Sequence, residues 1–204
     1  MGAFSGPITA NAYRVHGIPG DWPRVFEEMT RARFKDLKPG TEKDKSIGWV
    51  LADDPFSTDF SLATLFRGET LLLALRMDVL SLPGGQLKLH VEKAVAERLK
   101  KDGRDRLNRK EQEELAEEVR FDLMNRTVPT IKLAELVWNT DSGRAWFFSR
   151  AATMVAPFEE LFTETFGLRL LPDTPYTVAA DRLGEDRAEQ LLDWNTALLV
   201  EPEL

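Results

Sequence analysis

The chain has 204 residues, of which 43% are hydrophobic and 30% are charged, so it can bury a substantial core and is too apolar for a disordered protein. It has no cysteine, which excludes disulfides, thiolate zinc sites and cysteine nucleophiles, and only two histidines, His16 and His90. No run of 18 apolar residues and no signal peptide is visible. We expect a folded cytoplasmic protein with no membrane segment, metal site or cofactor, and not an enzyme.

The formal net charge of −7 argues on average against a nucleic-acid binder, but the charge is unevenly distributed. Residues 88–132 hold 12 basic and 10 acidic residues, a net of +2, whereas residues 158–204 hold 11 acids and three bases, a net of −8. Within the first segment, Asp102 and Asp105 are outnumbered by a run of seven cations: Arg98, Lys100, Lys101, Arg104, Arg106, Arg109 and Lys110. One part of the protein is therefore suited to phosphate and another would repel it.

The N-terminal third predicts a strand, a helix and a second strand. Alternating apolar and polar residues predict a half-buried strand over residues 11–16. Asp21 is a good N-cap, and apolar residues at helical spacing predict a helix over residues 22–34. A charged loop over residues 41–46 then leads to a short apolar run at residues 47–51.

The next segment predicts a β-hairpin. Residues 60–66 alternate in polarity and lead into a turn at residues 67–69. The leucine-rich residues 70–80 are interpreted as the return strand, although leucine also favours helix. The Leu-Pro-Gly-Gly sequence at residues 82–85 ends that run.

Two helices are predicted after this hairpin. Apolar residues four apart mark one face of a helix over residues 86–101, namely Leu87, Val91, Val95 and Leu99. Asn108 followed by Glu111 is the pattern of a capping box, and it starts a second helix with its own stripe at Leu115, Val119 and Leu123. We expect a protruding helical hairpin over about residues 86–125, with the seven cations around its connection.

The C-terminal third predicts a second β-hairpin from residues 131–138 and 144–148, followed by an amphipathic helix over residues 154–166. A short strand at residues 168–171 and a helix within residues 181–192 complete the pattern.

Hairpins without a repeated strand–helix rhythm indicate an α+β fold, in which antiparallel hairpins and sheets pack against helices. We expect one domain over residues 1–180 and an acidic tail over residues 181–204.

Few residues suggest catalysis. There is no phosphate-binding glycine loop of the G-x-x-x-x-G-K-[ST] type. Asp53, Asp54 and Asp59 would suit a metal-dependent nuclease, but they lie in a proline-containing turn. Each tryptophan lies in an apolar run and is interpreted as a core residue, not as a platform for nucleic-acid bases: Trp22, Trp49, Trp138, Trp146 and Trp194.

The cationic connection has two interpretations of similar weight. The acids between Glu111 and Glu118 could neutralise it through pairs four residues apart, leaving a solvated face. Alternatively, a protruding hairpin presents seven cations to backbone phosphates and has no side chains arranged to read bases.

Several local patterns resemble the recombination-associated protein RdgC family over about residues 10–175. They are the run at residues 46–50, Arg76 before Leu82-Pro83, and the helix leading into the residues at 98–101. The others are a second helix rich in lysine and glutamate, Arg126 near Pro129, and a hairpin carrying Trp138 before Gly143.

The resemblance implies a sequence-nonspecific DNA-binding protein of the bacterial cytoplasm and nucleoid. It also implies a ring-shaped homodimer around duplex DNA that restrains RecA-driven recombination, with Arg126 and Lys132 facing the DNA at the base of the hairpin. Some members are named as exonucleases, but no residue pattern here supports that chemistry. The chain ends well before the C-terminal part that longer members use in ring closure, and its own end is acidic.

Three hypotheses follow from these observations. The first is a duplex-DNA-binding protein of the RdgC type that modulates homologous recombination as a homodimer. The second is an interaction or regulatory module that kept the fold but lost DNA affinity, as the net charge of −7 suggests. The third is a metal-dependent nuclease, which rests on the aspartate loop alone.

Overall fold

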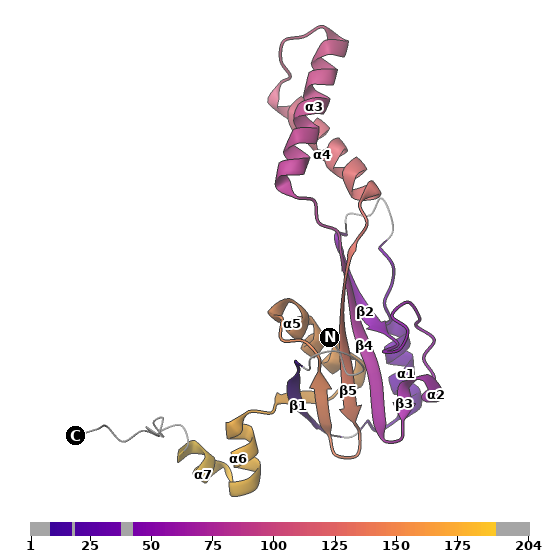
Figure 1. Ribbon diagram of the computed structural model, residues 1–204, viewed down its shortest axis with the longest axis vertical. Coiled ribbons are helices and arrows are strands. Elements are labelled where there is room, and N and C mark those ends of the chain that lie inside the picture. The colour runs from indigo at the N-terminus through magenta and orange to yellow at the C-terminus, as the bar shows by residue number, and fades with distance from the viewer. Residues whose placement is uncertain (1–8, 18, 38–42, 191–204) are drawn as a thin grey trace, which may run out of the picture.

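A computed structural model describes residues 9–17, 19–37 and 43–190, in which one antiparallel sheet carries helices on one face (Figure 1). The strand order is β2-β4-β5-β6-β1-β7, with β3 paired to β4. The strands are β1 Asn11–His16, β2 Lys45–Val50, β3 Phe66–Arg67, β4 Thr70–Val79, β5 Thr130–Asn139, β6 Arg144–Phe147 and β7 Arg169–Pro172. All pairs between these strands are antiparallel. The predicted α+β class is therefore confirmed.

Apart from the four-residue α2, the helices of the described residues fall into three groups along the molecule. α1 and α5 lie against the sheet, α3 and α4 project beyond one end of it, and α6 and α7 lie near the opposite end (Figure 1). Their bounds are α1 Trp22–Arg31, α2 Leu62–Leu65, α3 Gly84–Asp102, α4 Arg109–Arg126, α5 Ala152–Phe166, α6 Pro175–Leu183 and α7 Glu185–Glu189. Among the described residues, no helix is both long and apolar enough to cross a membrane.

The core lies between the sheet and the pair of helices α1 and α5. Alternate residues of β4 point into it, while Phe158 and Phe162 of α5 face them one helical turn apart. The ring of Phe158 stacks on that of Phe147 with 3.9 Å between the centroids. Fully burying one such side chain contributes about 1.5–3 kcal/mol, so α5 is held firmly on the sheet.

The helical hairpin is an insertion between the two longest strands. β4 and β5 pair over ten residues, from Thr70 opposite Asn139 to Val79 opposite Thr130. The chain leaves β4 at Val79, forms α3 and α4, and re-enters the sheet at Thr130. Val79 and Thr130, the residues on either side of the insertion, are paired with each other. The hairpin therefore projects from the end of these two strands, roughly along their length (Figure 1).

The expected strand over residues 60–66 is wrong. Ser61 instead caps α2, because its side-chain oxygen accepts the Thr64 N–H at 3.2 Å while the Thr64 hydroxyl oxygen accepts the Ser61 N–H at 2.9 Å. Only β3 remains extended and pairs with β4. This capping box satisfies the first turn locally, which explains why a helical turn replaces the expected strand.

Helix α1 ends at Arg31, earlier than the expected residue 34. The Phe34 N–H donates to the Trp49 carbonyl oxygen at 2.9 Å, and the Trp49 N–H donates to the Ala32 carbonyl oxygen at 3.0 Å. After α1, the backbone therefore forms hydrogen bonds with Trp49 of β2 as the chain crosses the edge of that strand. The helix does not continue, because these backbone groups are used in the crossing.

The one helix expected within residues 181–192 is found as two shorter helices, of which α7 lies inside that range and α6 begins before it. Thr174 caps α6, which starts at Pro175, and Gly184 with a φ of 87° separates it from α7. Residues 191 and 192 and the rest of the predicted acidic tail lie outside the described residues.

The tryptophans divide between the two faces of the sheet. Trp49 and Trp138 are fully buried, and Trp22 packs against the same core. Trp146 is 36% exposed, because it points to the face opposite α1 and α5, so its predicted place in the core is wrong. Trp194 lies outside the described residues.

Candidate nucleic-acid interface

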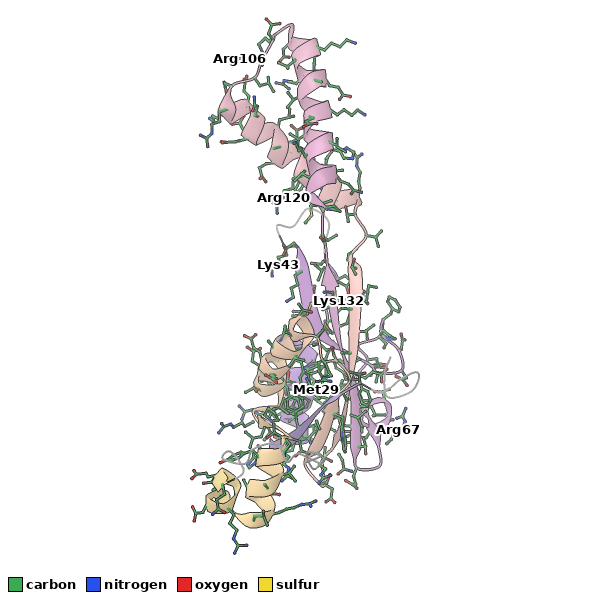
Figure 2. The ribbon with its side chains drawn as sticks, turned by 60° about the vertical axis from the view of Figure 1, so that its left-hand side comes forward. Met29, Lys43, Arg67, Arg106, Arg120 and Lys132 are labelled. Carbon is green, nitrogen blue, oxygen red and sulfur yellow. The ribbon has the colours of Figure 1, made fainter. Side chains whose placement is uncertain are left out.

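The hairpin formed by α3 and α4 is an arm with little core of its own. Neither helix contains a fully buried residue, and the predicted apolar stripes are only half-buried where the helices face each other. Gly103 ends α3 with a φ of 61°, a left-handed conformation that glycine adopts without a steric penalty. The predicted capping box at Asn108 is present and starts α4. The connection between the helices lies at the far end of the arm, as Arg106 shows (Figure 2).

Ion pairs join the two helix ends at this connection. Asp102 lies 3.1 Å from Arg98 Nε and 2.9 Å from an Arg104 guanidinium nitrogen. A second guanidinium nitrogen of Arg104 lies 2.8 Å from Glu111 Oε1. Arg104 therefore bridges the end of α3 to the start of α4.

The two carboxylates at this bridge are held in their charged forms. The hydrogen bond from Arg104, with a further contribution from Arg98, lowers the pKa of Asp102. The backbone N–H of Asn108, followed by Arg104, lowers the pKa of Glu111. A carboxyl group whose pKa is lower in the folded state stabilises that state above its unfolded pKa, and the effect disappears as the pH falls through the folded pKa.

We therefore predict that replacing Arg104 by Ala raises the pKa of both Asp102 and Glu111 towards their ordinary values. Carboxyl chemical shifts followed by NMR during acid titration measure this directly. Arg106→Ala is the matched control, because no ion pair of Arg106 occurs in the described structure, and it should leave both values unchanged. Unchanged values in Arg104→Ala would contradict the bridge.

Two further cations of the connection are paired along α4. Arg109 lies 2.9 Å from Glu113, and Lys110 lies 3.7 Å from Glu114. These are the pairs four residues apart that the alternative interpretation of the connection requires. All four side chains are well exposed, so each pair contributes about 1 kcal/mol or less and is easily exchanged for another partner.

Three cations of the connection have no ion pair among the described residues. Lys100, Lys101 and Arg106 are exposed near the end of the arm. Together with the four cations that have ion pairs, they form what we call the arm tip: Arg98, Lys100, Lys101, Arg104, Arg106, Arg109 and Lys110.

Arg126 and Lys132 lie at the base of the arm. Arg126 pairs with Asp122 at 3.2 Å, whereas Lys132 is exposed on β5 and has no ion pair in the described structure. Lys132 and Lys43 both lie near the junction of the arm with the sheet (Figure 2). The two predicted secondary residues are thus separated from the arm tip by the length of the helices.

The fold also groups cations that the sequence did not single out. Arg33, Lys35, Lys43 and Lys45 line a cavity of about 990 Å³ beside β2. Their sequence signal is weak, because they are spread across the end of a predicted helix and a charged loop. Only the crossing of the chain over β2 brings them together.

The aspartates of the nuclease hypothesis take part in local contacts. Asp54 accepts a hydrogen bond from the Phe56 N–H at 3.1 Å, and Asp53 lies 3.7 Å from Arg67. His16 lies on β1 and His90 on α3. Within residues 9–17, 19–37 and 43–190, no group of three or more histidine, cysteine, aspartate or glutamate residues is placed to hold a metal ion.

The sequence matches a protein-family model over most of its length. A family model described as "Putative exonuclease, RdgC" matches residues 10–181. The chain belongs to the RdgC family. The match runs from β1 into α6 and includes the entire arm, so the resemblance found in the sequence is confirmed. Membership of the RdgC family supports a recombination-associated role. Among curated proteins, a search finds no match.

Proposed function

We propose that this RdgC family member binds duplex DNA through its backbone phosphates, without sequence preference, and thereby modulates homologous recombination. The observation that carries the proposal is the arm, which has seven cations at the end of two exposed helices, three of them without an ion pair in the described part of the chain and two more in well-exposed pairs. The proposal places the protein in the cytoplasm, associated with the nucleoid. It involves no catalysis and no cofactor.

The chemistry of the arm tip suits phosphate more than bases. Its functional groups are ammonium and guanidinium ions, which attract phosphate at any sequence. The two apolar side chains of the arm that are most exposed, Leu89 and Phe121, lie on the helices and not in the connection. We therefore expect affinity to depend on salt and very little on sequence.

The arm tip is tested by replacing Lys100, Lys101, Arg104 and Arg106 together by Ala. Each phosphate neutralised contributes about −0.9 to the log–log slope of affinity against salt, so the slope should become shallower by about three to four units. Fluorescence anisotropy with a labelled duplex over a range of salt concentrations measures the slope. The melting temperature should change little, because exposed charges contribute about 1 kcal/mol or less each.

A matched control replaces four exposed cations at the other end of the molecule. Arg67, Arg169, Arg182 and Arg187 lie on β3, β7, α6 and α7. This control loses the same charge, and we expect it to keep nearly the wild-type slope. An unchanged slope in the arm-tip variant would mean that the tip is only a solvated face.

The proposal includes a twofold homodimer. Several large apolar side chains are exposed on the described surface and could pair between copies, among them Leu89, Phe121, Val128, Ile131, Leu133 and Trp146. Light scattering should give twice the chain mass at micromolar concentration. A monomer under these conditions would exclude a ring.

The second candidate is an interaction module without DNA affinity. Its support is the net charge of −7 and the ion pairs that occupy four of the seven cations at the arm tip. It differs from the first candidate in one measurable respect, because it predicts no duplex binding even at low salt.

A further inference from the structure

A second cationic surface lies on the body of the molecule, between α1, β2 and α5. It surrounds the cavity of about 990 Å³. Arg33 and Lys35 line it from the segment after α1, Lys43 from just before β2, Lys45 from the first residue of β2, and Glu164 from α5. We call this the β2 groove.

The groove exists because the chain crosses the edge of β2. Backbone hydrogen bonds join Ala32 and Phe34 to Trp49, and the Ser46 hydroxyl donates to the Lys35 carbonyl oxygen on the way past. The segment after α1 is therefore fixed against β2 at both ends of the crossing. Its cations are held beside those of β2 by backbone contacts, not by chance placement of long side chains.

The charges of the β2 groove do not cancel. Arg33, Lys35, Lys43 and Lys45 are exposed, and none has an ion pair among the described residues. The fifth cation of the lining, Arg31, pairs with Glu28 at 2.6 Å. The remaining acids of the lining are Asp36 and Glu164, so the lining carries five cations and three acids in a chain with a net charge of −7.

The groove lies at the end of the sheet from which the arm projects. Ile47 of β2 lies opposite Met77 of β4, which in turn lies opposite Lys132 of β5. Two strand spacings are about 10 Å, so Lys132 stands on the same sheet row as Ile47 of the groove. Lys45 lies opposite Val79, the last residue of β4 before the arm, so Lys45 is nearer to the arm along the strands than Lys132 is. Figure 2 shows Lys43 and Lys132 at this junction, on the side from which the arm projects.

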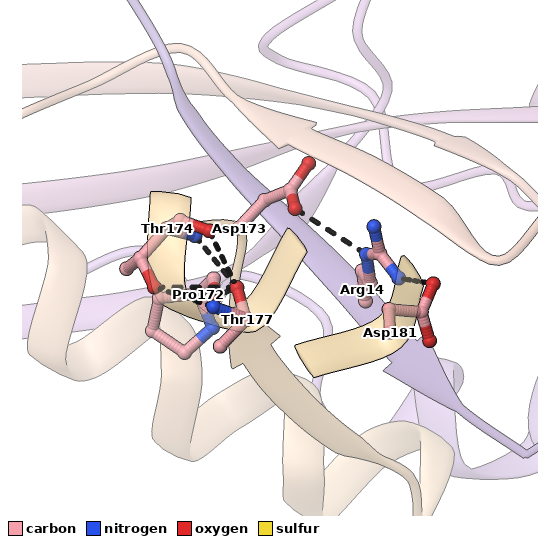
Figure 3. Close-up of polar contacts among 6 residues, drawn as sticks. All are labelled: Arg14, Pro172, Asp173, Thr174, Thr177 and Asp181. Carbon is pink, nitrogen blue, oxygen red and sulfur yellow. Dashed lines mark hydrogen bonds and ion pairs between the residues drawn. The ribbon is translucent and has the colours of Figure 1, made fainter. Parts of the chain in front are cut away.

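Arg14 on β1, near the other edge of the sheet, differs from the groove cations because it forms ion pairs. Arg14 of β1 is held by Asp173 and by Asp181 of α6 (Figure 3). Two nitrogens of the Arg14 guanidinium therefore already contact carboxylates, one from Asp173 and one from Asp181. The β2 groove differs from Arg14, because within the described residues its four cations Arg33, Lys35, Lys43 and Lys45 have no carboxylate partner.

We propose that the β2 groove is a second phosphate-contact surface for duplex DNA, which extends towards the arm through Lys45 and Lys43 and across the sheet to Lys132. This inference rests on the proposed function and assigns it residues beyond the arm tip. The cations stand around an open groove and do not converge on one buried point, an arrangement that fits a chain of phosphates better than a single small anion. A duplex held here meets the protein at two surfaces that are far apart in sequence.

The test replaces Arg33, Lys35, Lys43 and Lys45 together by Ala. We expect the log–log slope of duplex affinity against salt to become shallower by about three to four units. Combining these changes with the arm-tip variant should remove most of the remaining salt dependence. The matched control is again the replacement of Arg67, Arg169, Arg182 and Arg187 by Ala, because these exposed cations lie outside the groove lining and their loss removes the same charge, and its slope should stay nearly unchanged.

The outcomes separate this inference from the proposed function. A wild-type slope in the groove variant, with a reduced slope in the arm-tip variant, overturns the inference and leaves the proposed function standing. No duplex binding by the wild-type protein at low salt overturns both. Inorganic phosphate serves as the small-anion probe, and NMR shifts of groove lysines that saturate with phosphate as tightly as with duplex would make this a small-anion site and overturn the inference. Circular dichroism establishes that each variant is folded.

Discussion

Replacing Gly48 by Ala should destabilise the protein by about 3 kcal/mol, because the added methyl group has no space. A Cβ at this position would lie 2.4 Å from the backbone nitrogen of Phe34 and 2.5 Å from its Cα. These atoms belong to the segment that crosses β2, and backbone atoms cannot move aside as a flexible side chain can. At about 2–4 °C per kcal/mol, the melting temperature should fall by about 6–12 °C.

Gly85→Ala is the control for Gly48→Ala. Gly85 lies in the first turn of α3, and a Cβ there would meet no atom within 4 Å. Alanine has the higher helix propensity, so this change should be neutral or slightly stabilising. Equal melting temperatures for the two variants, measured by calorimetry, would contradict the close crossing at Gly48. Because the same crossing positions Arg33 and Lys35, Gly48→Ala should also weaken duplex binding by the groove.

Replacing Asp78 by Ala should cost about 3–5 kcal/mol, since it leaves a buried guanidinium without its main partner. Arg76 is only 6% exposed and donates two hydrogen bonds to Asp78, at 2.9 and 2.7 Å. Its guanidinium carbon lies 4.2 Å from the ring centroid of Phe34 and 4.9 Å from that of Phe56. After the change, the Pro55 carbonyl oxygen and the exposed Asp36 would be the remaining polar contacts.

A double variant distinguishes charge from packing at this pair. Arg76→Met with Asp78→Leu removes both charges and keeps apolar volume between the two rings, so it should recover most of the stability lost in Asp78→Ala. Urea unfolding of the two variants gives the comparison. A double variant that is less stable than Asp78→Ala would show that the ion pair itself, and not the unpaired charge, determines stability at this position.

The strands and long helices could be predicted from local patterns because those patterns agree with the tertiary contacts. β4 was assigned correctly although leucine also favours helix, because the turn at Gly68 and the break before α3 limit its length. The helical hairpin follows from two apolar stripes and the capping box at Asn108. These signals lie within short stretches of chain, so a single sequence is enough to predict the helices from them.

The errors arise where tertiary contacts or local caps override periodicity. Residues 60–66 alternate like a strand, yet the hydrogen bonds between Ser61 and Thr64 select a helical turn. Helix α1 stops at Arg31 because Trp49 offers backbone partners to the following residues. The exposure of Trp146 depends on which sheet face the helices cover, and no local pattern contains that information.

In the candidate site, too, some features have a local sequence signal and others depend on tertiary contacts. The arm tip was visible as a run of cations, but its ion pairs depend on the conformation of the connection, which joins Arg104 to both Asp102 and Glu111. The β2 groove was not visible at all. Arg33 and Lys45 are separated by a stretch of chain that periodicity does not describe, and their proximity follows only from the crossing at Gly48.

The most direct test of the account is the binding of the unaltered protein to two labelled duplexes of unrelated sequence across a range of salt concentrations. If the arm tip and the β2 groove bind backbone phosphates, the protein should bind at low salt with equal affinities for the two sequences and a log–log slope of about −0.9 for each phosphate neutralised. With the arm tip and the β2 groove both engaged, the slope should be steeper than that of either variant. Absence of binding to both duplexes at low salt, or an affinity that does not change with salt, would contradict the central claim.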